Sequence, residues 1–168
     1  MDPPTLSDGV VTLRPRRPED VDAIVAACQD PEIPRWTMVP SPYTREHAEE
    51  WLARPDHSSV HLLAVDADDR LLGSFSLMEI DRERGYGEIG YWLAAEARGR
   101  GFATRAVLLL RDWAASRGLR ELEIMTEPEN VASARVAERA GFARVEGLKA
   151  NPRDPSGDVK HIVYVWRG

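Results

Sequence analysis

Two arginines and two glycines alternate where an expected strand meets an expected helix. Arg98, Gly99, Arg100 and Gly101 stand between an apolar segment and a long alanine- and leucine-rich segment. Glycine lets the backbone turn tightly and bring its N–H groups close to a ligand. The positive end of the following helix dipole favours an anion at the same place. The spacing predicts a phosphate or diphosphate site; the alternative is an ordinary connector, since glycine turns often precede helices.

The common nucleotide-binding patterns are missing from this turn. The chain contains no G-x-x-x-x-G-K-[ST] segment, and Thr104 stands where G-x-G-x-x-G needs its third glycine. The pattern that remains is R-x-x-G-x-A, from Arg98 to Ala103.

That pattern resembles the acyl-CoA-binding signature of the GNAT N-acetyltransferase superfamily, [RQ]-x-x-G-x-[GA]. Residues 126–142, which contain Asn130 and Ser133, are similar to the N-x-x-S-x-x-[VL]-x-x-[KR]-x-G-F segment of the RimJ/RimL-type branch. Residues 30–52, with their proline- and tryptophan-rich start, also look like that branch. The three segments follow the family's order and cover nearly the whole chain.

The resemblance implies acetyl-CoA as the acyl donor. The glycine-rich turn would bind the pyrophosphate, and the strand before it would pair with the pantetheine arm through exposed backbone groups. The residues expected to bind the donor are Tyr91, Trp92, Leu93, Arg98, Gly99, Arg100, Gly101, Phe102, Ala103, Thr104 and Asn130. A helix N-cap is the simpler role for Asn130, and the two roles are compatible.

Acetyl transfer requires a neutral amine, so the acceptor decides how much base is needed. An α-amino group has a pKa near 8, whereas a lysine side chain has one near 10.4. Strand alternation places Glu88 on one face with Tyr86, Gly90 and Trp92, beside the expected cleft. Glu88 is therefore the candidate base; the alternative is an ion-paired or solvated strand residue.

The leaving thiolate has little need of a general acid, because the pKa of its thiol is near 8.5. Many members of the superfamily have a tyrosine four residues before the glycine of the G-F pair, but Ala137 occupies that position here. The resemblance to RimJ/RimL-type sequences implies that the serine three residues after the asparagine, here Ser133, could hydrogen-bond the sulfur instead; it could also simply satisfy backbone groups at the helix start. A backbone N–H near Leu93 would stabilise the oxyanion.

Acceptor specificity is expected from the first two helices and the proline-rich segment 31–43, where Arg35, Trp36 and Tyr43 lie. Core packing is the alternative for the aromatic residues. The acceptor could be a protein N-terminus, an amino acid, a polyamine or an antibiotic. A non-catalytic acyl-CoA sensor or scaffold is a second hypothesis, and a phosphate- or nucleotide-binding regulator is a third.

Length, composition and charge limit the number of domains, the location and the ligands that we expect. A chain of 168 residues with 43% hydrophobic residues predicts one domain over residues 1–168. A net charge of −6 argues against nucleic-acid binding. Without an apolar run or leader pattern, we expect a cytoplasmic protein that does not enter membranes. The single cysteine and four histidines show no metal-ligand spacing, so no metal is expected. A homodimer remains open.

The expected fold is mixed α/β, with the order β-α-α-β-β-β-α-β-α-β-β. The expected strands are residues 10–13, 60–65, 71–80, 86–93, 121–126, 142–148 and 160–166. The expected helices are residues 18–28, 44–53, 101–116 and 131–140. The resemblance implies a mostly antiparallel sheet with a splayed parallel pair, in which the strands that begin at Glu88 and Glu121 form a V and the exposed edge lies near Tyr91, Trp92 and Leu93.

Overall fold

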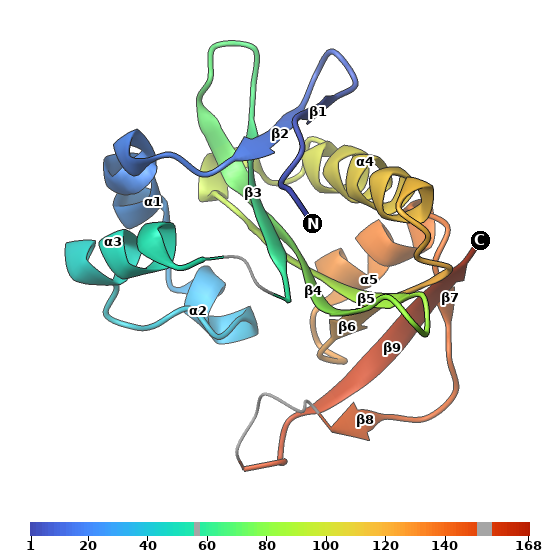
Figure 1. The fold of residues 1–168 in the computed structure, drawn as a ribbon. Helices are drawn as coiled ribbons and strands as arrows, with labels where there is room; N and C mark the ends of the chain where they lie inside the picture. The colour runs from blue at the N-terminus through green and yellow to red at the C-terminus, as the bar shows by residue number, and fades with distance from the viewer. Residues whose placement is uncertain (56–57, 151–155) are drawn as a thin grey trace.

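A sheet with the strand order β1-β2-β3-β4-β5-β6-β9-β7 runs through the centre of the molecule, and β8 pairs with β9 (Figure 1). The computed structural model describes residues 1–55, 58–150 and 156–168. Its strands are β1 Leu6–Ser7, β2 Thr12–Pro15, β3 Val60–Val65, β4 Leu71–Asp81, β5 Tyr86–Leu93, β6 Glu121–Thr126, β7 Ala143–Arg144, β8 Lys149–Ala150 and β9 Lys160–Arg167. Its α-helices are α1 Val21–Ala27, α2 Glu32–Trp36, α3 Arg45–Ala53, α4 Phe102–Ser116 and α5 Val131–Arg139, with 3-10 turns at Pro18–Asp20 and Ala95–Ala97.

The sheet contains a parallel pair that separates along its length. Strands β3, β4 and β5 form the expected antiparallel meander, and β6 pairs with β9 antiparallel. Strands β5 and β6 are parallel, but their pairing ends at Glu88 and Glu123. Beyond that point β5 continues to Leu93 beside β4, while β6 continues to Thr126 beside β9. The expected mixed sheet with a splayed parallel pair is confirmed.

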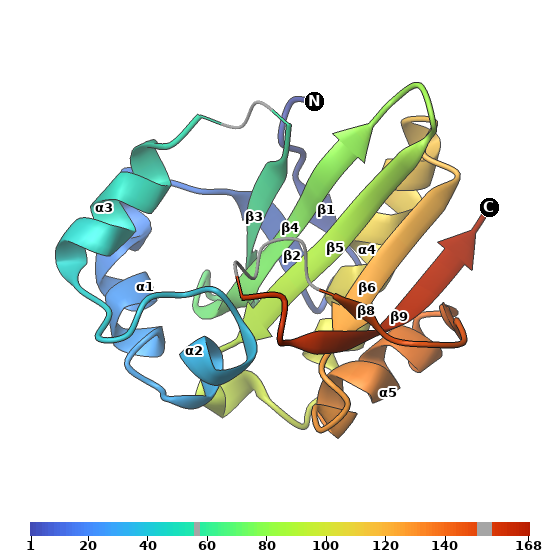
Figure 2. The same ribbon diagram turned by 90° about the horizontal axis from the view of Figure 1, so that it is seen from below.

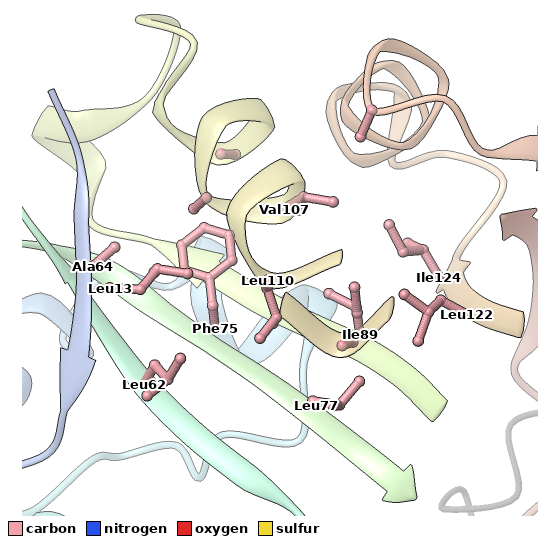
Figure 3. Close-up of a cluster of buried hydrophobic side chains, with 14 of the residues drawn as sticks. Leu13, Leu62, Ala64, Phe75, Leu77, Ile89, Val107, Leu110, Leu122 and Ile124 are labelled. Atoms are coloured by element: carbon pink, nitrogen blue, oxygen red, sulfur yellow. The ribbon is translucent and has the colours of Figure 1, made fainter. Parts of the chain in front are cut away.

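Helices cover both faces of this sheet. Helices α1, α2 and α3 lie on one side, and α4 and α5 lie on the other (Figures 1 and 2). The larger apolar cluster packs α4 against the sheet, with Phe75, Leu77, Ile89 and Leu110 fully or almost fully buried (Figure 3). A second cluster packs α1 and α3 onto the opposite face around Leu63. Both faces of β5 are therefore covered.

Local sequence explains where the helices begin. The Thr44 hydroxyl accepts a hydrogen bond from the His47 N–H, which caps α3 as expected. The Asn130 side chain caps α5 by accepting from the Ser133 N–H at 3.2 Å. Helix α4 buries an apolar stripe with helical spacing, which consists of Ala103, Ala106, Val107, Leu110 and Ala114.

Three expected elements differ from the structure. The first strand, expected at residues 10–13, begins later, as β2 at Thr12, because Val10 and Val11 donate their N–H groups to Asp8 in a turn; the short strand β1 before that turn was not expected. The proline-rich segment contains the short helix α2. The strand expected at residues 142–148 is reduced to β7, because the chain turns away at Gly147, whose φ is +89°. Residues 151–155 of the loop expected to follow lie outside the described residues.

Within the described ranges, every helix is too short or too polar to cross a bilayer.

Candidate active site

A cavity of about 630 Å³ opens where β5 and β6 separate. Its lining comes from β5 and β6, from the start of α5, and from the helices α1, α2 and α3 that cover the opposite side. Ten of the predicted site residues line it: Glu88, Tyr91, Trp92, Leu93, Arg98, Ala103, Asn130, Ser133, Trp36 and Tyr43. The structure therefore brings together residues that are up to 97 positions apart in the chain, from Trp36 to Ser133.

The glycine-rich turn lies at the edge of this cavity and leads into α4. Gly99 and Gly101 have φ values of +72° and +79°, in the left-handed region that favours glycine. A Cβ added at either glycine would meet no heavy atom within 4 Å, so the space over the turn is open. Gly101 and Thr104 border a neighbouring groove between α4 and α5. An open turn at the start of a 15-residue helix suits a diphosphate.

The two arginines of the turn behave differently. Arg100 is exposed, and its guanidinium carbon lies 4.8 Å from the centre of the Phe102 ring, which is itself buried. Arg98 donates a hydrogen bond to the Leu93 carbonyl at 2.9 Å and forms an ion pair with Asp30 at 2.5 Å. Arg98 thus ties the turn to the end of β5 and to the segment before α2. Binding of pyrophosphate by either arginine remains a prediction.

Glu88 is buried at the floor of the cavity. The residue is only 3% exposed, and it stands at the last paired position of β5 and β6. Gly90 and Trp92, which follow on the same face of β5, also line the cavity. A carboxylate at this depth can accept a proton from a group that enters from the α1–α3 side.

Ser133 faces the cavity from the first turn of α5 and is held at two points. Its backbone N–H donates to the Asn130 side chain, and its Oγ lies 2.9 Å from the Tyr91 Oη. Tyr91 packs flat on Phe75, with ring centres 5.2 Å apart and an interplanar angle of 9°. Burial raises the pKa of Tyr91 to about 12.

Sequence reasoning assigned Tyr91 a backbone role only and missed its hydroxyl contact with Ser133. The two residues are 42 positions apart, and no local pattern joins them. Strand alternation is the one signal that was present, because it places Tyr91 on the opposite face of the strand from Glu88.

The predicted acceptor residues are divided between surface and core. Trp36 lines the cavity and donates from its indole nitrogen to Glu32 at 3.0 Å. Arg35 stacks on Trp36 but is outside the lining. Tyr43 lines the cavity and belongs to the second apolar cluster, and burial raises its pKa to about 12.

A polar group on the same side of the sheet was also missed. His61 of β3 shares a 2.6 Å hydrogen bond with Ser76 of β4 and a 3.1 Å hydrogen bond with Ser59. The Trp51 ring stands edge-on to His61, and the three residues His61, Ser76 and Trp51 line the cavity. Alternation along β3 and β4 would have placed His61 and Ser76 on the face of Glu88.

The part of the chain that the structure describes contains no group of three or more histidine, cysteine, aspartate or glutamate side chains placed to hold a metal ion.

Comparisons with known proteins identify the family of the chain. Residues 11–143 match the family model of the acetyltransferase (GNAT) domain. The chain is 31% identical over 152 residues to p20 of Bacillus licheniformis, an uncharacterized N-acetyltransferase, and the match covers 86% of this chain and 84% of p20.

Two solved structures share the fold at lower identity. RimL, a ribosomal L7/L12 α-N-protein acetyltransferase in complex with coenzyme A, superposes with a TM-score of 0.83 at 21% identity and covers 98% of each chain. A spermidine N-acetyltransferase from Vibrio cholerae, in complex with CoA and spermine, gives a TM-score of 0.78 at 20% identity and covers 95% of each chain. Because the family model matches most of this chain, the chain belongs to the GNAT acetyltransferase family.

Proposed function

We propose that this protein transfers the acetyl group of acetyl-CoA to a primary amine by direct attack within a ternary complex. The observation that carries the proposal is that one cavity is lined by Glu88 on one side and by Ser133 and the end of β5 on the other. A donor and an acceptor that enter from opposite sides of the sheet would meet between these residues.

The turn and the separated strands fit the two halves of the donor. The open backbone at Gly99 and Gly101 suits the pyrophosphate. Backbone groups of Tyr91, Trp92 and Leu93 on the side of β5 that faces away from β4 suit the amides of the pantetheine arm. Asn130 lines the cavity at the start of α5 and can contact the same arm.

In the proposed reaction, Glu88, a backbone N–H group and Ser133 each have one role. The amine nitrogen bonds to the acetyl carbon while Glu88 takes the proton that the nitrogen loses. A backbone N–H near Leu93 stabilises the oxyanion. The carbon–sulfur bond then breaks, and the sulfur leaves as a thiolate to which the Ser133 hydroxyl donates a hydrogen bond.

The acceptor would bind on the α1–α3 side, between Trp36, Tyr43 and the carboxylate of Glu88, with Arg35 stacked on Trp36 outside the lining. Both signs of charge line this side, because Glu50 and Arg54 belong to it and Glu32 pairs with Arg35. A protein N-terminal amine is the acceptor that we favour. Its pKa near 8 leaves about a tenth of it neutral at pH 7, so that one buried carboxylate is enough to complete deprotonation.

The test is a mass-shift and thiol-release assay with acetyl-CoA against N-terminal peptides, polyamines, aminoglycosides and free amino acids. Glu88→Gln should lower kcat/KM for the preferred amine by about 10²- to 10⁴-fold and leave the Kd for acetyl-CoA unchanged.

Glu123→Gln is the matched control. Glu123 stands opposite Glu88 on β6, but its carboxylate accepts from Tyr86 and pairs with Lys149, away from the cavity lining. This variant should retain activity. If wild-type protein binds acetyl-CoA but acetylates none of these amines, the proposal fails and a sensor role replaces it.

A further inference from the structure

Tyr91 connects β5 to α5 at the point where the sheet has separated. The backbone pairing between β5 and β6 ends three residues earlier, at Glu88. Beyond it, the Tyr91 hydroxyl reaches Ser133 of α5, at 2.9 Å from Oγ and 3.4 Å from the carbonyl oxygen. The contact lies beside the cavity, because both residues line it.

The surroundings of Tyr91 favour it as the donor in this hydrogen bond. Burial keeps its phenol protonated throughout the physiological pH range. Stacking on Phe75 fixes the ring, so the phenol oxygen stays next to Ser133, where Oγ at 2.9 Å is the nearer acceptor and the carbonyl oxygen lies at 3.4 Å. The Ser133 oxygen has two lone pairs and one hydrogen. When a phenol donates to that oxygen, the serine hydrogen is left for a different acceptor.

We propose that Tyr91 is a positioning residue that holds the Ser133 hydroxyl with its hydrogen directed at the donor sulfur. The inference rests on the proposed function, in which Ser133 faces that sulfur. Asn130 fixes the backbone of Ser133 and Tyr91 fixes its side chain, so the hydroxyl is oriented before the thioester binds. No proton leaves Tyr91 in the reaction: the amine proton goes to Glu88, and the sulfur departs as a thiolate.

An oriented donor at the sulfur should be measurable without any acceptor amine. A hydrogen bond to a charged group stabilises the charged form, so the thiol of bound coenzyme A should ionise at lower pH than the free thiol. Ultraviolet absorbance of the thiolate, followed against pH with coenzyme A bound, reports this directly. Ser133→Ala should raise the pKa of the bound thiol by about one unit.

Tyr91→Phe should raise the pKa of the bound thiol in the same direction. This variant keeps the aromatic ring that packs on Phe75 and removes only the hydroxyl, so the fold should survive. The double variant should match Ser133→Ala alone, because Tyr91 acts only through Ser133. A general packing role would instead shift the titration equally with or without the serine hydroxyl.

Tyr164→Phe is the matched control. Tyr164 also projects a buried phenol from a strand, β9, toward α5, where burial and the Glu138 carboxylate raise its pKa, but it does not line the cavity. This variant should leave the titration of the bound thiol unchanged. A Tyr91→Phe variant that titrates like wild type, while Ser133→Ala does not, overturns the positioning role alone. If Ser133→Ala also titrates like wild type, the role of Ser133 at the sulfur is overturned together with that of Tyr91, whereas the proposed function is overturned only if coenzyme A does not bind or no amine is acetylated.

Discussion

Replacing Gly101 with alanine tests two properties of the glycine-rich turn, its left-handed backbone and the open space above it. The first affects stability, and the second affects ligand binding. Gly101 has a φ of +79°, a conformation that costs an alanine about 1–2 kcal/mol. A methyl group there meets no heavy atom within 4 Å, so no steric clash is added to this cost. For a domain of this size, the melting temperature should fall by about 2–8 °C.

The effect on the donor should be larger than the effect on stability. The methyl group would project into the open space over the turn, where the pyrophosphate is expected to approach the backbone N–H groups at the start of α4. We expect the Kd for coenzyme A to rise by at least about tenfold, which corresponds to about 1.4 kcal/mol. Isothermal titration calorimetry measures this, at a temperature well below the melting transition.

Gly118 supplies the matched control from the other end of the same helix. It follows the C-cap Arg117, its φ is +92°, and an added Cβ would again meet nothing within 4 Å. Gly118→Ala should therefore lose similar stability but bind coenzyme A like the wild type. If the two alanine variants bind coenzyme A with equal affinity, the turn does not hold the pyrophosphate, and the reasoning about this part of the site is refuted.

Two further predictions concern titratable groups. The Arg14 guanidinium lowers the pKa of Asp69 in the folded protein. A carboxyl group with a lowered folded-state pKa stabilises the fold at pH values above its unfolded-state pKa, near 3.9. This stabilisation is lost as the pH falls through the folded-state pKa. The melting temperature should therefore be lower at pH 3 than at pH 5, with a smaller difference in Asp69→Asn; an equal difference in both proteins would contradict this. Cys28 is 4% exposed and burial raises its pKa to about 12, so a disulfide reagent at pH 8 should label it slowly unless denaturant is present. Complete labelling of the native protein within minutes would be the opposite result.

The central strands and long helices could be predicted because local signals agree there. A turn that ends at Gly85 precedes β5 in the sequence, and Thr44 caps α3 as its residue type suggests. The sequence did not predict helix α2, because the prolines in segment 31–43 disfavour a helix. Pro34 stands in the first turn of that helix, where a missing N–H costs nothing, and the Asp30 side chain accepts from the Glu32 N–H.

The site was predictable where one segment contains the whole feature. The turn at Gly99 and Gly101 is such a segment, and its left-handed geometry follows from residue type alone. The ion pair of Arg98 with Asp30 and the contact of Tyr91 with Ser133 each join segments that only the folded chain brings together. Spacing along the sequence carries no information about such pairs.

The pairing between β5 and β6 stops before either strand ends, and this affects which side chains in the family can change. Beyond Glu88, the carbonyl and amide groups of β5 that face β6 have no pairing with that strand, while those that face β4 stay paired. If the pantetheine arm pairs with these groups, as proposed, that pairing does not depend on the side chains of Trp92 and Leu93, because every residue type except proline offers the same main-chain N–H and C=O groups. Main-chain contacts of this kind are compatible with the low identity between proteins of this architecture, since this chain and RimL share 21% of their residues at a TM-score of 0.83.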